Sequence, residues 1–84
     1  MFNKAHYKLI RRNEVLALTG LSKSTLYNRI NDVLFTPPIS LGLRAVAFIA
    51  SEVEAVIHAM IKEQPPAEIK ALVSNLIQQR KQSA

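Results

Sequence analysis

The residues best suited to molecular recognition in this chain lie in a short polar segment after Gly20. Helical spacing of i, i+3, i+4 and i+7 places four of them on one face: Ser24, Tyr27, Asn28 and Asn31. That face is uncharged and rich in hydrogen-bond donors and acceptors, which is the chemistry that reads base edges in the major groove of DNA. An ordinary helical hairpin with a solvated polar face would show the same pattern, so both interpretations stay open at this point.

On the DNA interpretation, each residue type has a role. Ser22 can cap the helix, and the free amides of the first turn can meet a phosphate. Asn28 can pair with adenine through two hydrogen bonds, while Lys23 and Arg29 can hold phosphates or read guanine. The residues that we expect to contact DNA from this helix are Ser22, Lys23, Ser24, Thr25, Tyr27, Asn28 and Arg29.

Two short helices must position these side chains. The first is predicted over about 13–18, with Asn13 as its N-cap, and Gly20 ends it because glycine enters a left-handed C-cap without steric cost. The second is predicted over about 23–31, with Leu26 and Ile30 turned toward the first helix. Two helices joined by a tight turn that contains glycine predict a helix-turn-helix.

A β-hairpin is predicted directly after these helices. The segment Thr36-Pro37-Pro38 breaks helical geometry, and apolar residues then alternate on either side of a turn at Gly42–Ala45. A helix-turn-helix followed by such a hairpin predicts a winged helix. Arg44 lies in the turn, where it can enter a minor groove or grip the DNA backbone; a solvated turn arginine is the alternative.

The rest of the chain is predicted to be helical. Ser51-Glu52-Val53-Glu54 matches a capping box, the helix that follows is expected to end near Glu63, and Pro65-Pro66 separates it from a last helix that begins near Ala67. The fold class predicted is therefore mainly α with a short β-hairpin. We divide it into a winged helix-turn-helix at 1–64 and an amphipathic extension at 65–84, which either completes the core or dimerises.

Composition and charge support a polyanion partner. The chain has 84 residues, 11 Lys and Arg, 6 Asp and Glu, and a formal net charge of +5. Residues 1–50 hold seven of the basic and two of the acidic residues, whereas residues 51–84 hold four of each. The whole excess thus lies in the first half, which is the charge distribution expected of a protein that binds a polyanion. A soluble protein with a basic N-terminal half and no nucleic-acid role would show the same distribution, so both interpretations stay open on charge alone. Arg11 and Arg12 are expected to add auxiliary contacts.

Several functional classes are excluded or disfavoured. A chain this short forms an exposed binding surface more easily than an enclosed pocket. We therefore expect that the protein is not an enzyme and has neither catalytic residues nor a cofactor. There is no cysteine, and His58 four residues after Glu54 is too small a set to bind a metal. No apolar run reaches the roughly 18 residues of a membrane span, and no signal peptide is visible, so we expect a cytoplasmic, nucleoid-associated protein without membrane contact.

The run Glu14–Ser22, followed by Ser24–Tyr27, resembles the AlpA family of short prophage regulators and the first part of MerR-type winged helices. The likeness continues through Pro38-Ile39 and Leu41–Phe48 and covers about Leu9 to Ile57. It implies a winged-helix DNA-binding protein of a prophage or integrated island that regulates transcription or acts as an excisionase. The chain departs from the family in having Val33 where glycine is usual, and Phe48 and Val56 where tryptophan is usual.

The resemblance also implies partners, of which double-stranded DNA is the main one and an integrase is a second. Self-association as a homodimer or a cooperative array is a third possible partner, suggested by the apolar stripe of the last helix and by the small area that a single module buries on DNA. A different class of function stays open beside DNA binding: a protein-binding module that inhibits or escorts a partner such as a response regulator or an integrase.

Overall fold

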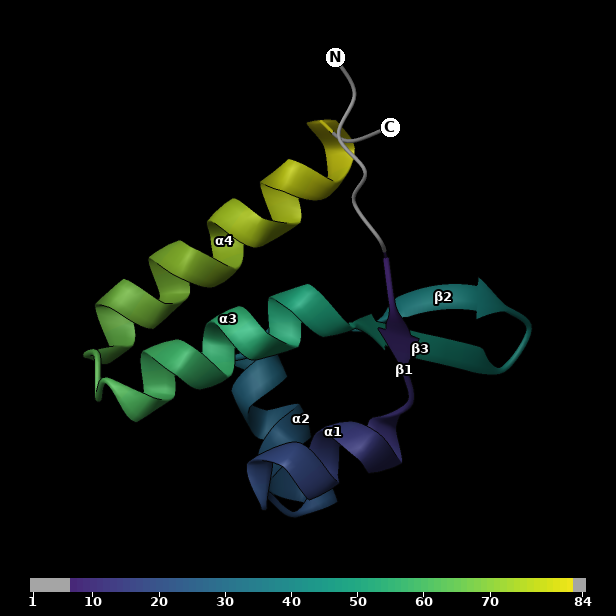
Figure 1. The fold of residues 1–84 in the computed structure, drawn as a ribbon, viewed down its shortest axis with the longest axis horizontal. Helices are drawn as coiled ribbons and strands as arrows, with labels where there is room; N and C mark the ends of the chain where they lie inside the picture. Colours follow the sequence, from purple (N-terminus) through teal and green to yellow (C-terminus); the bar gives the residue numbers. More distant parts are fainter. Residues whose placement is uncertain (1–6, 83–84) are drawn as a thin grey trace.

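The computed structural model describes residues 7–82 and confirms a winged helix-turn-helix fold with an added C-terminal helix (Figure 1). In this range the chain forms four α-helices and a small three-stranded antiparallel sheet. α3 lies across the middle of the molecule, with α1 and α2 on one side of it and α4 on the other. Residues 1–6 and 83–84, the outer ends of the two predicted units, lie outside the described range.

The helix-turn-helix consists of α1 (Arg12–Thr19) and α2 (Lys23–Asn31). Gly20 ends α1 in the left-handed conformation, with φ of 73°, as the sequence predicts. The prediction of Asn13 as N-cap is wrong: Arg11 holds that position, and its carbonyl accepts the backbone N–H groups of Glu14 and Val15. Helix α1 begins earlier because the chain enters it directly from a short strand.

The sheet has the strand order β1-β3-β2, formed by β1 (Leu9–Ile10), β2 (Ile39–Gly42) and β3 (Ala45–Ile49). β2 and β3 are the predicted hairpin, and the structure adds β1, which pairs Ile10 with Phe48. The turn residue Arg44 is left-handed, with φ of 59°. A non-glycine residue in this conformation costs about 1–2 kcal/mol.

The last two helices are α3 (Ala50–Ile61) and α4 (Pro66–Gln82). The predicted capping box is wrong: Ile49 is the N-cap of α3, no side chain of the described residues caps this end, and Ser51 lies inside the helix. Strand β3 passes straight into α3, so Ser51 never occupies the capping position. α3 ends at Ile61, two residues before the predicted end, and Pro66 opens α4, a position that proline favours.

One hydrophobic core takes side chains from all four helices, from β1 and β3, and from the segment that follows α2. Its fully buried side chains include Val15, Leu26, Phe35 and Phe48, and the rings of Phe35 and Phe48 meet edge to face at 6.4 Å. Helix α4 contributes to this same core through two residues, Ile69 and Val73. Helix α4 thus packs against α3, while Leu72, Leu76 and Ile77 of its apolar stripe stay half-buried. The division into units at 1–64 and 65–84, and the choice between completing the core and dimerising, stay predictions.

Candidate nucleic-acid interface

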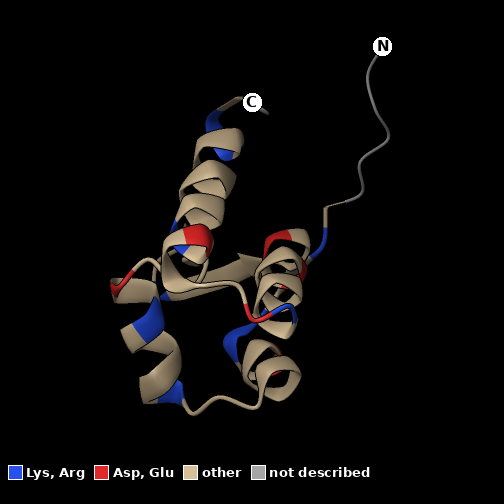
Figure 2. Cartoon of the chain, turned by 90° about the vertical axis from the view of Figure 1, so that its left-hand side faces the viewer, with Lys and Arg blue, Asp and Glu red and all other residues tan. Residues whose placement is uncertain are grey.

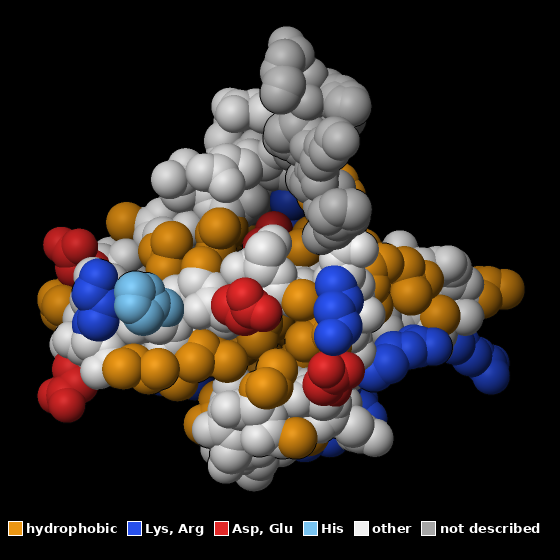
Figure 3. Space-filling view, in the orientation of Figure 1, with side chains coloured by type: hydrophobic (Ala, Val, Ile, Leu, Met, Phe, Trp, Pro, Cys, Tyr) orange, Lys and Arg blue, Asp and Glu red, His pale blue; other side chains and the backbone are white. Residues whose placement is uncertain are grey.

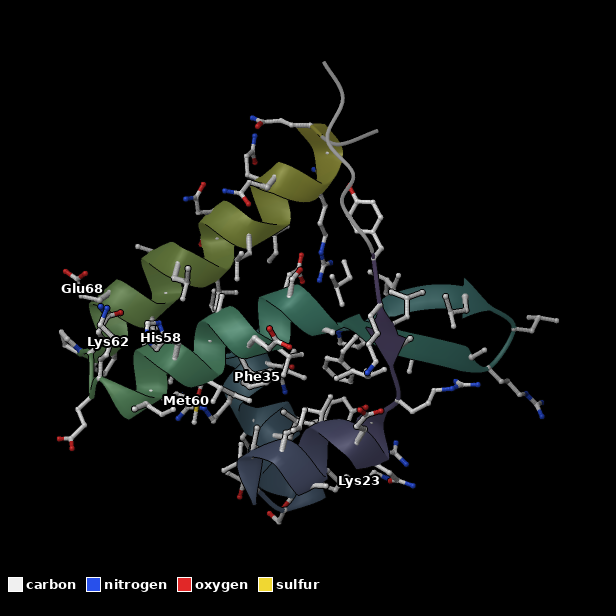
Figure 4. All side chains as sticks on the ribbon, viewed as in Figure 1. Lys23, Phe35, His58, Met60, Lys62 and Glu68 are labelled. Carbon is white, nitrogen blue, oxygen red and sulfur yellow. The ribbon has the colours of Figure 1, made fainter. Side chains whose placement is uncertain are left out.

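Helix α2 presents its outer side to solvent and lies well away from α4 (Figures 1 and 2). The buried anchor is Leu26, which is fully enclosed and packs α2 onto the core. Among the predicted contact residues, Asn28 is exposed and Tyr27 is half-buried. The other exposed ones are Ser22, Lys23, Ser24 and Thr25. Figure 4 places Lys23 at the edge of the molecule opposite α4.

The start of α2 is held by hydroxyl groups. The backbone N–H of Thr25 donates to Ser22 Oγ at 3.2 Å, and the Ser22 hydroxyl donates to Thr25 Oγ1 at 2.9 Å. Ser22 is therefore the N-cap that the sequence predicts. Within residues 7–82, the side chains of Lys23 and Asn28 make no hydrogen bond, so both can meet a ligand without breaking an internal contact.

Arg29 has a different position from its neighbours on α2. It is half-buried, and its Nη2 donates to the backbone carbonyl of Leu34 at 3.2 Å. Its Nε is buried and has no hydrogen-bond partner in the described part of the chain. Arg29 thus holds the segment that follows α2, a structural contact that helical spacing alone did not indicate.

Three arginines from two distant parts of the sequence meet between α1 and the wing. Arg11, Arg12 and Arg44 line an open hollow of about 300 Å³ together with Asn13 and Val46. Arg11 Nη1 donates to the carbonyl of Val46 at 3.0 Å, which ties the start of α1 to strand β3. The basic side chains gather beneath the wing in Figure 3.

The chemistry of this hollow suits an anion. No side chain of the described residues caps the N-terminus of α1, and the amide of Glu14 donates to the Arg11 carbonyl, so Arg12 and Asn13 are the first-turn residues whose backbone amides can meet an anion. Arg12 Nε is buried and lacks a hydrogen-bond partner among residues 7–82. In the same range no group of three or more His, Cys, Asp or Glu residues could hold a metal ion.

The tip of the wing carries a residue that the sequence analysis did not single out. Leu43 is 96% exposed, between Gly42, where β2 ends, and Arg44. Leu41 and Val46 are also exposed, at 48% and 39%. The sequence did contain a signal for this exposed residue, because Leu43 is an apolar residue in the predicted turn, between Gly42 and Arg44.

Helix-turn-helix, wing and basic hollow define a winged helix-turn-helix protein. A family model described as the prophage CP4-57 regulatory protein (AlpA) matches residues 8–61. The chain belongs to this family of prophage regulatory proteins, and the family resemblance drawn from the sequence is confirmed. Helix α4 lies outside the matched range.

Comparison with curated proteins gives a phage relative. An uncharacterized protein, ORF88 of Enterobacteria phage P4, is 46% identical over 48 residues, which are 57% of this chain and 54% of the relative. The chain thus spans about half the length of this relative. No solved structure matches the chain significantly. Within residues 7–82, no helix is long and apolar enough to cross a membrane.

Proposed function

We propose that this protein binds double-stranded DNA sequence-specifically and acts as a regulator of a prophage or integrated element, in transcription, in excision or in both. The observation that carries the proposal is the exposed polar face of α2 on the same module as a hollow lined by three arginines. A helix fits the major groove, and guanidinium groups are suited to phosphate oxygens. Both features are supplied by the part of the chain that the family model covers.

In this proposal, residues of α2 read the bases, and residues around the hollow hold the DNA backbone. Asn28 and Tyr27 face base edges in the major groove, and Ser24 supports them. Lys23 contacts a phosphate at the start of α2, where the hydroxyls of Ser22 and Thr25 hold the first turn. Arg29 acts mainly from inside the module, through its bond to Leu34.

The residues that line the hollow beneath the wing hold the DNA backbone. Arg11, Arg12 and Arg44 hold one stretch of DNA backbone between α1 and the wing. Arg44 extends this contact toward the adjacent minor groove. Such contacts fix the register of α2 on the duplex without reading sequence themselves.

The proposal also names partners and a location. An excisionase of this kind works beside an integrase, and a single small module buries only about 600–1,000 Å² on DNA, so cooperative loading of several copies would raise affinity. We place the protein in the cytoplasm, on the nucleoid.

The experiment that tests the function is selection of bound duplexes from a random pool, followed by titration of the recovered sequence with purified protein. The expected result is a defined site, bound more tightly than scrambled duplex by a factor of at least about 1,000. Recovery of no common sequence, together with equal affinity for scrambled duplex, would refute sequence-specific binding.

A second candidate function rests on the apolar wing. Leu41, Leu43 and Val46 expose apolar side chains on one hairpin, which could dock on a protein partner instead of DNA. Affinity capture from a host lysate after nuclease treatment tests this candidate. Retention of an integrase or response regulator, lost in Leu43→Asp, with no shifted DNA probe, would favour the protein-binding module over the DNA-binding regulator.

A further inference from the structure

Arg80, near the end of α4, reaches across the molecule to the start of α3. Its Nε donates to Glu52 Oε2 at 2.8 Å, and its Nη2 donates to Glu52 Oε1 at 2.6 Å. Glu52 is only 6% exposed, and Arg80 is its ion-pair partner among the described residues. A two-pronged pair of this kind has a fixed geometry, because the planar guanidinium matches the carboxylate edge.

The same guanidinium also holds the segment that joins α2 to the wing. Arg80 Nη2 donates to the carbonyl of Pro37 at 2.7 Å and lies 3.3 Å from Thr36 Oγ1. Thr36 is fully buried, and its hydroxyl donates to Glu52 Oε1 at 2.6 Å. Strand β2 begins at Ile39, two residues after Pro37. A contact at Pro37 therefore acts directly on the base of the wing.

The connecting segment 32–38 is thus held at three points, Leu34, Phe35 and Pro37. Arg29 of α2 binds its Leu34 carbonyl, and Arg80 of α4 binds its Pro37 carbonyl. Between them the Phe35 ring packs against Phe48 of β3, and Figure 4 places Phe35 at the centre of the molecule, beside α3. Three separate elements therefore set the direction in which the chain leaves α2 and enters β2.

A buried ion pair is weak evidence for added stability, because removing two charges from water costs about as much as their attraction returns. What such a pair does fix is geometry. Here the geometry is the position of the wing relative to α2, the two parts that the proposed function places on one duplex.

We propose that Arg80 is a positioning residue for DNA binding: through Glu52, Thr36 and Pro37, α4 fixes the wing so that Arg44 and α2 engage the same duplex together. This inference rests on the proposed function. It assigns a role to a helix that lies outside the range matched by the family model.

The test is a double-mutant cycle on duplex affinity between Arg80 and Arg44, which share no hydrogen bond within residues 7–82. We call the contacts of Arg80 with Glu52 and Pro37 the brace. The brace is removed by the pair Glu52→Gln and Arg80→Met, which leaves net charge unchanged and keeps an acceptor for the Thr36 hydroxyl. In the unaltered chain, Arg44→Ala is expected to weaken binding about tenfold. In the brace-free chain, the same change is expected to weaken binding less than about twofold, because Arg44 no longer reaches its phosphate.

A matched control changes the same charges elsewhere. Glu54→Gln with Lys81→Met alters one exposed acid on α3 and one exposed base on α4 without touching the connecting segment. In this control Arg44→Ala should keep its full tenfold effect. All titrations are made below the unfolding midpoint of each variant, determined by circular dichroism, so loss of fold does not enter the comparison.

Should the brace-free chain fail to fold, Arg80→Lys provides the second measurement, because lysine keeps the charge but cannot bind Glu52 and Pro37 with a planar fork. Its expected Arg44→Ala effect lies between two- and tenfold. A full tenfold effect of Arg44→Ala in the brace-free or Arg80→Lys chain would overturn the positioning role. Absence of duplex binding by the unaltered chain would refute the proposed function itself, and with it this inference.

Discussion

The basic hollow beneath the wing leads to a quantitative prediction on salt dependence. The proposed function places four cations on DNA phosphates, and none of them has a carboxylate partner among the described residues: Arg11, Arg12, Lys23 and Arg44. Each neutralised phosphate contributes about −0.9 to the slope of log affinity against log salt, so the slope should be about −3.6. Affinity should then fall about 150-fold between 50 and 200 mM salt.

The substitution that tests this salt dependence is Arg44→Ala. Arg44 is fully at the surface of the turn and makes no hydrogen bond or ion pair within residues 7–82, so its removal should leave the fold intact. Losing one phosphate contact should reduce the slope to about −2.7, which corresponds to a fall of about 40-fold over the same salt range. Fluorescence anisotropy of a labelled duplex that carries the selected site measures both slopes.

A matched control is Lys81→Ala, which removes one exposed cation from α4, the helix on the far side of α3. Its slope should equal that of the unaltered protein. Equal slopes for Arg44→Ala and the unaltered protein, or a reduced slope for Lys81→Ala, would refute the placement of DNA beneath the wing.

Three further predictions follow from α2. Asn28→Ala should leave the melting temperature unchanged and alter the base preferred at one position of the selected site, measured by repeating the selection. Ser22→Ala should cost about 1 kcal/mol of unfolding free energy, because the cap to Thr25 is lost, and should lower the melting temperature by about 4–8 °C. Leu26→Ala should cost about 2–5 kcal/mol in urea unfolding, because the side chain is fully buried.

Each of these has its own contradicting result. An unchanged selected sequence for Asn28→Ala would remove its base-reading role. A melting temperature unaffected by Ser22→Ala would mean that the hydroxyl cap does not stabilise α2. A loss below about 1 kcal/mol for Leu26→Ala would mean that α2 is not anchored in the core.

Features with local causes were predictable from the sequence. Gly20 ends α1 because few other residues adopt its backbone conformation, and Ser22 begins α2 because its hydroxyl reaches a nearby amide. The Pro37-Pro38 break and the alternation after it gave the hairpin. These signals involve residues only a few positions apart, so a single sequence contains them in full.

Features that depend on contacts between distant residues were not predictable. The capping box failed because β3 runs directly into α3, so that Ile49 is the N-cap and Ser51 lies inside the helix. The contact between Glu52 and Arg80, 28 positions apart, was likewise not predicted. Arg11 and Arg44 were assigned to separate places, and it is the pairing of β1 with β3 that brings them to one hollow. Arg29 likewise turned out to hold Leu34, a contact that composition and spacing do not encode.

The most direct test of the central claim is a proximity measurement at α2. The chain contains no cysteine, so Asn28→Cys provides a single thiol on the exposed face of α2, and Ser74→Cys provides a matched exposed thiol on α4. Each variant is mixed with the selected duplex carrying a thiol tethered to a base in the major groove, and disulfide cross-linking is measured. Cross-linking by Asn28→Cys and none by Ser74→Cys is the predicted result. Cross-linking by Ser74→Cys alone, or equal cross-linking by both, would contradict the placement of α2 in the major groove.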